Sequence, residues 1–214
     1  MTKPRYRAVI FDLLTALLDS WSLWNAIAGS TAAGLRWRTK YLALTYGSED
    51  YEDYEFLVSE AARQANVPIE AALKLIDRWA DLTPWPEAAR VLQKLAPHVP
   101  LGVATNCSRT LGHDAAEAVA DLAGISFATV ITAEEAGFYK PHPLPYEMAL
   151  NTLGTLPEET LFVAGSPHDV PGAAGVGMPV YWHNRLKLAN ANPQAQPAYE
   201  YESLEPLLEL FSGR

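Results

Sequence analysis

The sequence predicts an α/β protein whose core is a doubly wound parallel sheet, with a helical cap domain inserted after the first strand. Short apolar segments alternate with helix-length segments from residue 83 onward, and this alternation is typical of parallel sheets. The first apolar run, residues 9–11, reads as a strand buried on both faces and ends on a carboxylate, Asp12. About sixty residues with helical periodicity follow it, which is more than a simple crossover requires.

The core elements are expected in chain order after that strand. Proline near a helix start and glycine after a helix end mark several boundaries, with Gly124 and Gly154 as the closing glycines of two helices. Strands are expected at residues 101–105, 128–131, 161–164 and 179–182, and helices at 86–95, 111–122, 146–153 and, as a short turn, 172–177. A surface loop is expected after Asn184, and a closing helix at 204–211.

Residues 20–82 are expected to be helical throughout. Trp21, Trp24 and Ile27 recur at helical spacing and predict a first helix, and similar periodicity predicts helices at 37–44, 54–66 and 69–81. We interpret this block, residues 20–82, as a cap domain seated over a core domain that residues 1–19 and 83–214 form.

Composition excludes several classes of function. The single cysteine, Cys107, excludes an internal disulfide and a cysteine-built zinc site. A net charge of −9 argues against a nucleic-acid partner, because phosphate binding needs a basic surface. No apolar run is long enough to span a bilayer and no signal peptide precedes the first strand, so we expect no membrane partner and a cytoplasmic location.

Four polar positions follow predicted strands, and the carboxyl ends of parallel strands meet at one edge of a sheet. They are Asp12, the pair Thr105 and Asn106, Lys140, and Asp169. Each has a simpler alternative. Asp12 could be a member of a structural ion pair and Lys140 a solvated loop lysine, whereas Thr105, Asn106 and Asp169 could cap the helices that follow them. Their order, each after a strand, predicts one shared pocket.

With these loops, the chain resembles the haloacid dehalogenase superfamily across nearly its whole length, and within it the L-2-haloacid dehalogenase branch. Three further stretches carry the resemblance to that branch. They are residues 37–42 (WRTKYL), residues 51–61, which hold YEDY and VSEA, and residues 140–146 (KPHPLPY). The fold that the resemblance implies is a Rossmann-like core with a helical cap.

The resemblance also implies roles for the loop residues. Asp12 would attack an sp³ carbon and form an ester, which divides one hard displacement into two easier steps. Lys140 would pair with Asp12 and keep it ionised, because a nearby positive charge lowers a carboxylate pKa. Asp169 would position Lys140 or the water that hydrolyses the ester.

The same resemblance implies how the substrate is held. Thr105 and Asn106 would bind its carboxylate, Arg38 would reach it or its leaving group from the cap, and Tyr146 would line the pocket. Leu14, which stands where dehalogenases usually carry an aromatic side chain, is a further substrate-binding candidate.

Departures from the superfamily pattern exclude a magnesium phosphatase. Phosphatases of the superfamily carry a second aspartate where this chain has Leu14, which cannot transfer a proton. The stretch Ala164–Asp169 also lacks the usual first acidic metal ligand, and phosphoryl transfer normally needs magnesium. We therefore expect no metal and no other cofactor.

Residues 13–21 (LLTALLDSW) resemble those of superfamily hydrolases that open the four-membered ring of L-azetidine-2-carboxylate. A leaving ammonium group needs a carboxylate or an aromatic face, which makes Asp19, Trp21 and Trp24 candidates to hold it. The simpler alternatives are that Asp19 caps the first cap helix and that both tryptophans only pack.

The sequence therefore predicts a metal-independent hydrolase of a small 2-substituted carboxylic acid, with L-azetidine-2-carboxylate as the favoured substrate. The first alternative is an L-2-haloacid dehalogenase, and the second is an inactive module that binds a small carboxylate. Fold alone does not establish activity. The resemblance makes a homodimer possible.

Overall fold

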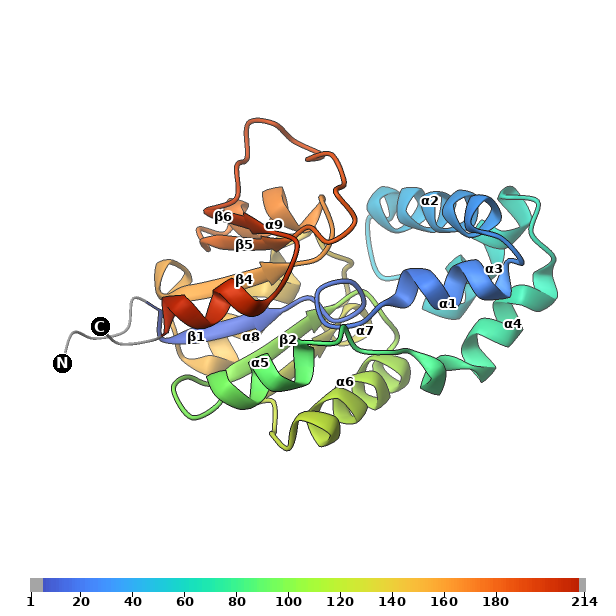
Figure 1. Ribbon diagram of the computed structural model, residues 1–214. Coiled ribbons are helices and arrows are strands. Elements are labelled where there is room, and N and C mark those ends of the chain that lie inside the picture. The colour runs from blue at the N-terminus through green and yellow to red at the C-terminus, as the bar shows by residue number, and fades with distance from the viewer. Residues whose placement is uncertain (1–5, 212–214) are drawn as a thin grey trace.

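The computed structural model describes residues 6–211 and contains a parallel sheet of six strands. The spatial order is β3-β2-β1-β4-β5-β6, so the chain starts at the centre, moves outward to β3 and then returns to the other side of β1 (Figure 1). The strands are β1 (Ala8–Phe11), β2 (Leu101–Thr105), β3 (Thr129–Thr132), β4 (Thr160–Ala164), β5 (Val180–His183) and β6 (Tyr199–Tyr201). Ligands of such sheets bind where the strand order reverses, beyond the strands' carboxyl ends.

Helices cover both faces of this sheet. Neighbouring side chains of a strand point to opposite faces, and the apolar side chains on each face are buried by helices. Val9 and Phe11 belong to the apolar cluster on the side of α5 and α6, whereas Ile10 belongs to the cluster on the side of α8 and α9. The core helices are α5 (Ala88–Leu95), α6 (Arg109–Ala123), α7 (Ala133–Ala136), α8 (Pro143–Leu153) and α9 (Asp169–Gly175), with 3₁₀ turns at Pro157–Glu159 and Glu205–Leu210.

A block of helices lies beyond the carboxyl ends of the strands (Figure 1). It consists of α1 (Ser20–Ile27), α2 (Thr31–Gly47), α3 (Tyr54–Gln64), α4 (Ile69–Asp77) and the 3₁₀ turn Trp79–Asp81. Aromatic rings hold it together, with the Trp24 and Trp37 ring centroids 4.5 Å apart. Its two connections to the sheet touch at an antiparallel bridge between Leu18 and Pro84. The division into a cap domain and a core domain at these connections stays a prediction.

Most expected core elements are present, with ends that differ by a few residues. Gly124 and Gly154 close α6 and α8 in the left-handed conformation, at φ values of 64° and 63°. The expectation that residues 20–82 are helical throughout is wrong at residues 48–53. These residues lie between two of the expected helices and form an irregular connection. That connection ends at Asp53, whose carboxylate accepts a hydrogen bond from the Phe56 backbone N–H and starts α3.

Two more expectations need correction. The segment after Asn184 is a loop only in part, because it contains β6, which pairs in parallel with β5. The expected closing helix at 204–211 is a 3₁₀ turn instead. The short helix α7 was not expected, although its sequence contains a capping box between Thr132 and Glu135.

Within residues 6–211, no helix combines the length and the apolar character needed to cross a bilayer.

The loops after β1 and β4 pack so closely that a larger residue at Gly165 should destabilise the fold. A Cβ there would lie 2.2 Å from the Ala16 backbone N and 2.3 Å from the Thr15 carbonyl carbon. We expect Gly165→Ala to lower the free energy of unfolding by about 1–3 kcal/mol, the usual range for overpacking. Gly175→Ala is the matched control, since a Cβ at that position meets nothing within 4 Å. Urea unfolding measures both, and equal losses in the two variants would contradict this packing.

Candidate active site

Asp12 directly follows β1 and carries a buried carboxylate in a ring of hydrogen-bond donors. Its Oδ2 accepts hydrogen bonds from the Thr15 backbone N–H (3.0 Å), the Thr15 hydroxyl (2.6 Å) and the Ala16 backbone N–H (3.2 Å). Its Oδ1 accepts one hydrogen bond, from the Lys140 ammonium at 2.9 Å. The two oxygens therefore differ in environment, and Oδ1 is the less constrained one.

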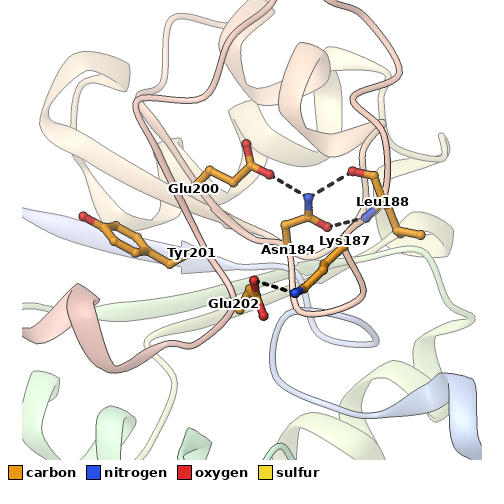
Figure 2. Close-up of a pocket in the computed structure, with 6 residues that line it drawn as sticks. All are labelled: Asn184, Lys187, Leu188, Glu200, Tyr201 and Glu202. Carbon is orange, nitrogen blue, oxygen red and sulfur yellow. Dashed lines mark hydrogen bonds and ion pairs between the residues drawn. The ribbon is translucent and has the colours of Figure 1, made fainter.

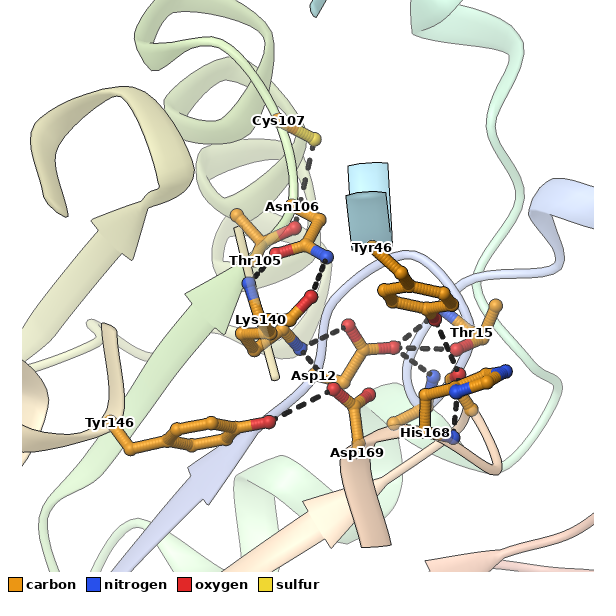
Figure 3. A network of polar contacts seen from close by, with 12 residues as sticks. Asp12, Thr15, Tyr46, Thr105, Asn106, Cys107, Lys140, Tyr146, His168 and Asp169 are labelled. Atoms are coloured by element: carbon orange, nitrogen blue, oxygen red, sulfur yellow. Dashed lines mark hydrogen bonds and ion pairs between the residues drawn. The ribbon is translucent and has the colours of Figure 1, made fainter. Parts of the chain in front are cut away.

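Lys140 lies between two carboxylates (Figure 3). Its Nζ is 2.9 Å from Asp12 Oδ1 and 3.1 Å from Asp169 Oδ1, and the whole side chain is buried. The Asn106 side chain fixes the Lys140 backbone, because its Nδ2 donates to the Lys140 carbonyl (2.9 Å) and its Oδ1 accepts from the Lys140 N–H (2.7 Å). The loop after β2 thus positions the lysine that follows β3.

Charges in this cluster shift the three pKa values unequally. Burial alone would raise the pKa of Asp12, but the Lys140 charge and the hydrogen bonds from Lys140 and Thr15 outweigh it and lower the pKa overall. Burial raises the pKa of Asp169 to about 6, against the opposing Lys140 charge. Burial would lower the pKa of Lys140, but both carboxylates raise it. At neutral pH, Asp12 is an ionised carboxylate beside a charged ammonium.

The cluster forms the floor of a cavity of about 470 Å³ between the sheet and the helical block. Sequence reasoning placed four further candidates here, and they do line the cavity: Leu14, Trp21, Arg38 and Asn106. A second hollow of about 610 Å³ lies at the β6 edge (Figure 2). Its charged side chains and Asn184 are paired, as in the 3.1 Å contact of Lys187 with Glu202 and the 2.7 Å contact of Asn184 with Glu200.

Arg38 is the cation on the side of the cavity that α2 forms. Its guanidinium donates to the Ser20 hydroxyl (2.7 Å) and lies 4.2 Å above the Trp21 ring. Burial lowers the pKa of Arg38, but an arginine remains charged at neutral pH. Among the described residues it forms no ion pair, and its buried Nε has no hydrogen-bond partner. A buried charge without a partner is costly, which makes this guanidinium a site for an anionic group.

Another wall of the cavity contains Tyr46, Ser166 and His168, of which Tyr46 carried no expectation from the sequence. The Tyr46 and His168 rings are in contact, with centroids 4.1 Å apart and planes tilted by 38°, and Tyr46 Oη lies 3.4 Å from Ser166 Oγ. Burial lowers the pKa of His168, so this imidazole is neutral at pH 7. The available signal for Tyr46 was its position eight residues after Arg38, on the same face of one helix.

Several predicted substrate contacts lie outside the cavity. Thr105 is fully buried, with its hydroxyl 3.6 Å from Cys107 Sγ. Tyr146 lies behind the floor, where its hydroxyl donates to Asp169 Oδ1 at 3.3 Å. Neither side chain lines the cavity, so their placement does not support direct contact with a substrate there. Asn106 lines it, but its amide is occupied by the Lys140 backbone.

Two candidates for holding a leaving nitrogen have structural roles instead. Asp19 caps α1, since its carboxylate accepts from the Ser22 N–H (3.1 Å) and the Ser22 hydroxyl (2.6 Å). Trp24 packs against Trp37 and lies outside the cavity lining. In the described part of the chain, no group of three or more His, Cys, Asp or Glu side chains could hold a metal ion.

Comparisons with known proteins identify the family and the fold of the chain. Residues 6–177 match the family model of the haloacid dehalogenase-like hydrolases. The chain is 30% identical to haloacetate dehalogenase H-2 of Moraxella sp. (strain B) over 66% of its length and 63% of that protein. It is 27% identical to the (S)-2-haloacid dehalogenase of Pseudomonas putida over 92% and 93% of the two chains. The solved L-2-haloacid dehalogenase RSc1362 has a TM-score of 0.85 at 26% identity, covering 97% of this chain and 99% of that one.

The unequal carboxylates predict two different titrations. In protein labelled with ¹³C at aspartate carboxyl carbons, one carboxyl should titrate near pH 6, because burial raises the pKa of Asp169 to that value. The pKa of Asp12 should lie below its ordinary value, so this carboxylate should show no transition near pH 6. Asp169→Asn should remove the transition near pH 6. Persistence of that transition in the variant, or its absence from the native protein, would contradict the assigned charges.

Proposed function

The chain belongs to the haloacid dehalogenase-like hydrolase family, and we propose that it displaces a leaving group from carbon in a small 2-substituted carboxylic acid. The observation that carries the proposal is the contact of Asp12 Oδ1 with Lys140 on the floor of a cavity that a free guanidinium faces. A nucleophile, its charge partner and an anion-binding group are thereby present in one cavity.

In the first step, Asp12 Oδ1 attacks the substituted carbon. A carbon–oxygen bond forms, and the leaving group departs with the bonding electrons. Lys140 keeps Asp12 ionised before attack, and Asp169 holds the ammonium in place through its 3.1 Å contact. Asp12 becomes an ester of the substrate, and the negative charge of the carboxylate is consumed.

In the second step, water attacks the Asp12 carboxyl carbon and the bond between that carbon and Oδ1 breaks. Oδ1 leaves as the hydroxyl oxygen of the product and takes one proton of the water, while the other proton passes to solvent and Asp12 is again a carboxylate. Oδ2 has become the ester carbonyl oxygen, and negative charge develops on it during this attack. The Thr15 N–H, the Thr15 hydroxyl and the Ala16 N–H already point at this atom, at distances of 2.6 to 3.2 Å. Such preorganised donors are the usual form of an oxyanion hole.

The cavity suits a small acid. Arg38 supplies the positive charge for the substrate carboxylate, and four leucines make much of the remaining lining apolar: Leu14, Leu35, Leu42 and Leu188. A cavity of about 470 Å³ lies at the lower end of the range for small-molecule sites. These features support a short-chain carboxylic acid as the substrate.

Two leaving groups compete within this proposal. A halide is favoured by the names of the relatives, which are 2-haloacid and haloacetate dehalogenases. A ring nitrogen, as in L-azetidine-2-carboxylate, is favoured by the resemblance of residues 13–21, and none of the relatives reported above bears that activity in its name. The wall of Tyr46, Ser166 and His168 offers neutral acceptors and aromatic faces, which an ammonium can use.

Neither a metal-dependent phosphatase nor an inactive binding module explains the site as well. Leu14 stands where a phosphatase needs its second aspartate, and Lys140 provides the positive charge beside Asp12. A binding module would not need an ionised carboxylate with one oxygen in a ring of donors. Metal independence and a homodimer stay predictions.

Loss of the nucleophile should abolish turnover. We expect Asp12→Asn to lower kcat by roughly a thousandfold or more, because a carboxamide cannot form the ester. Asp121→Asn, at an exposed position on α6, is the matched control and should keep full activity. Steady-state product formation measures both. Substantial turnover by Asp12→Asn would exclude the mechanism.

Loss of the free cation should weaken substrate binding. We expect Arg38→Met to raise KM about 10- to 100-fold, since a hydrogen bond to a charged group contributes roughly 1.5–3 kcal/mol. Arg36→Met removes an exposed arginine from the same helix and should leave KM unchanged. An unaltered KM in Arg38→Met would show that the substrate carboxylate is held elsewhere.

The two leaving groups can be separated by their products. Purified protein is incubated with EDTA and either L-2-chloropropionate or L-azetidine-2-carboxylate, and products are identified by mass spectrometry. Lactate and chloride identify a dehalogenase, whereas homoserine identifies a ring-opening hydrolase. Activity that EDTA abolishes and magnesium restores would contradict metal independence.

A further inference from the structure

Trp85 contacts the nucleophile loop from behind, on the side away from the cavity lining. It lies in the segment that returns from the helical block to the sheet, and its side chain is buried. Its indole Nε1 donates a hydrogen bond to the Thr15 carbonyl oxygen at 3.0 Å. Its backbone N–H donates to the Leu17 carbonyl at 2.9 Å. This tryptophan is therefore tied twice to the loop that follows Asp12.

The bonded carbonyl belongs to the peptide unit that serves Asp12. The Thr15 C=O and the Ala16 N–H are the two ends of one planar trans peptide, so they point in opposite directions. The Ala16 N–H donates to Asp12 Oδ2 at 3.2 Å, while the Thr15 C=O accepts from Trp85. A bond that fixes the carbonyl also fixes the direction of the N–H, and it polarises that N–H further.

Other contacts hold this arrangement. Nδ1 of buried His183 lies 2.9 Å from the Ala16 carbonyl oxygen, and because a carbonyl only accepts, Nδ1 carries the proton. The Trp85 ring packs between the His183 ring, at 6.0 Å, and the Arg185 guanidinium, at 4.8 Å. Gly165 leaves no space for the peptide to move toward β4.

We propose that Trp85 is a positioning residue, which aims the Ala16 N–H at Asp12 Oδ2 and thereby stabilises the oxyanion formed during ester hydrolysis. The proposal rests on the ester mechanism proposed above. His183 holds the other side of Ala16, because it binds the carbonyl of the Ala16–Leu17 peptide, whose Leu17 N–H donates to the Leu13 carbonyl at 3.2 Å. Loss of this alignment slows the second step more than the first, because negative charge develops on Oδ2 only when water attacks the ester.

The test compares two tryptophans with the same local chemistry. Trp79 is also buried, and its Nε1 donates to the Leu111 carbonyl in α6 at 2.8 Å, away from the nucleophile loop. Trp85→Phe and Trp79→Phe each remove one indole N–H from a buried carbonyl. We expect both to lose thermal stability, but only Trp85→Phe to show a kcat about 10-fold lower, because removal of a whole oxyanion donor costs 10²–10³.

The decisive readout is the fraction of enzyme that carries the ester during steady-state turnover, measured by intact-protein mass spectrometry. Slower hydrolysis should raise this fraction and lower KM in Trp85→Phe, while Trp79→Phe should match the native protein. His183→Leu should act in the same direction, and His183→Asn should restore the native fraction because its amide can donate in place of Nδ1.

The outcomes separate this inference from the proposed function. Equal ester fractions in Trp85→Phe, Trp79→Phe and an active native protein would overturn the positioning role and leave the ester mechanism intact. Native protein that turns over either substrate without any ester would overturn both. If Trp85→Phe does not fold, the His183 pair decides, and identical ester fractions in His183→Leu and His183→Asn would reject the inference.

Discussion

The site depends on one buried ammonium that two carboxylates share. Lys140 lies within 3.1 Å of Asp12 and Asp169, and none of the three side chains is accessible enough for water to screen its charge well. Removal of one member of such a cluster leaves an uncompensated buried charge. The cluster is also asymmetric, because the hydrogen bonds from Thr15 favour ionised Asp12 and leave Asp169 with the raised pKa. This asymmetry supports the proposal that Asp12 is the nucleophile.

The fold brings these charges together from distant parts of the chain. Asp12 follows the central strand β1, Asp169 begins α9 after its neighbour β4, and Lys140 lies on the long connection after β3. Asn106 bridges the gap between β2 and that connection by binding the Lys140 backbone on both sides. The helical block adds Arg38 and Tyr46 to the cavity lining, while Ser166 and His168 come from the loop after β4. In the proposed function, the sheet supplies the reacting groups and Arg38 of the helical block binds the substrate carboxylate.

Residue patterns predicted the sheet and its charged cluster better than the substrate contacts. Five strands and the meeting of Asp12, Lys140 and Asp169 follow from apolar runs and from the rule that parallel strand ends converge. Strand β6 carries no such signal, since three residues in a polar segment pair only through the distant β5. Thr105 faces away from the cavity although its neighbour lines it, because side-chain direction alternates along a strand. Trp85 acts through a backbone carbonyl, which residue identity does not reveal.

The central claim is that an oxygen of Asp12 enters the product. It is tested most directly by a single turnover in H₂¹⁸O with enzyme in excess over substrate, followed by mass analysis of the product and of the peptide that contains Asp12. The account predicts ¹⁸O in the Asp12 carboxylate and unlabelled oxygen in the new hydroxyl group, because water attacks the ester at the carboxyl carbon. Label in the product hydroxyl, with none in Asp12, would mean that water attacks the substrate directly and would contradict the account.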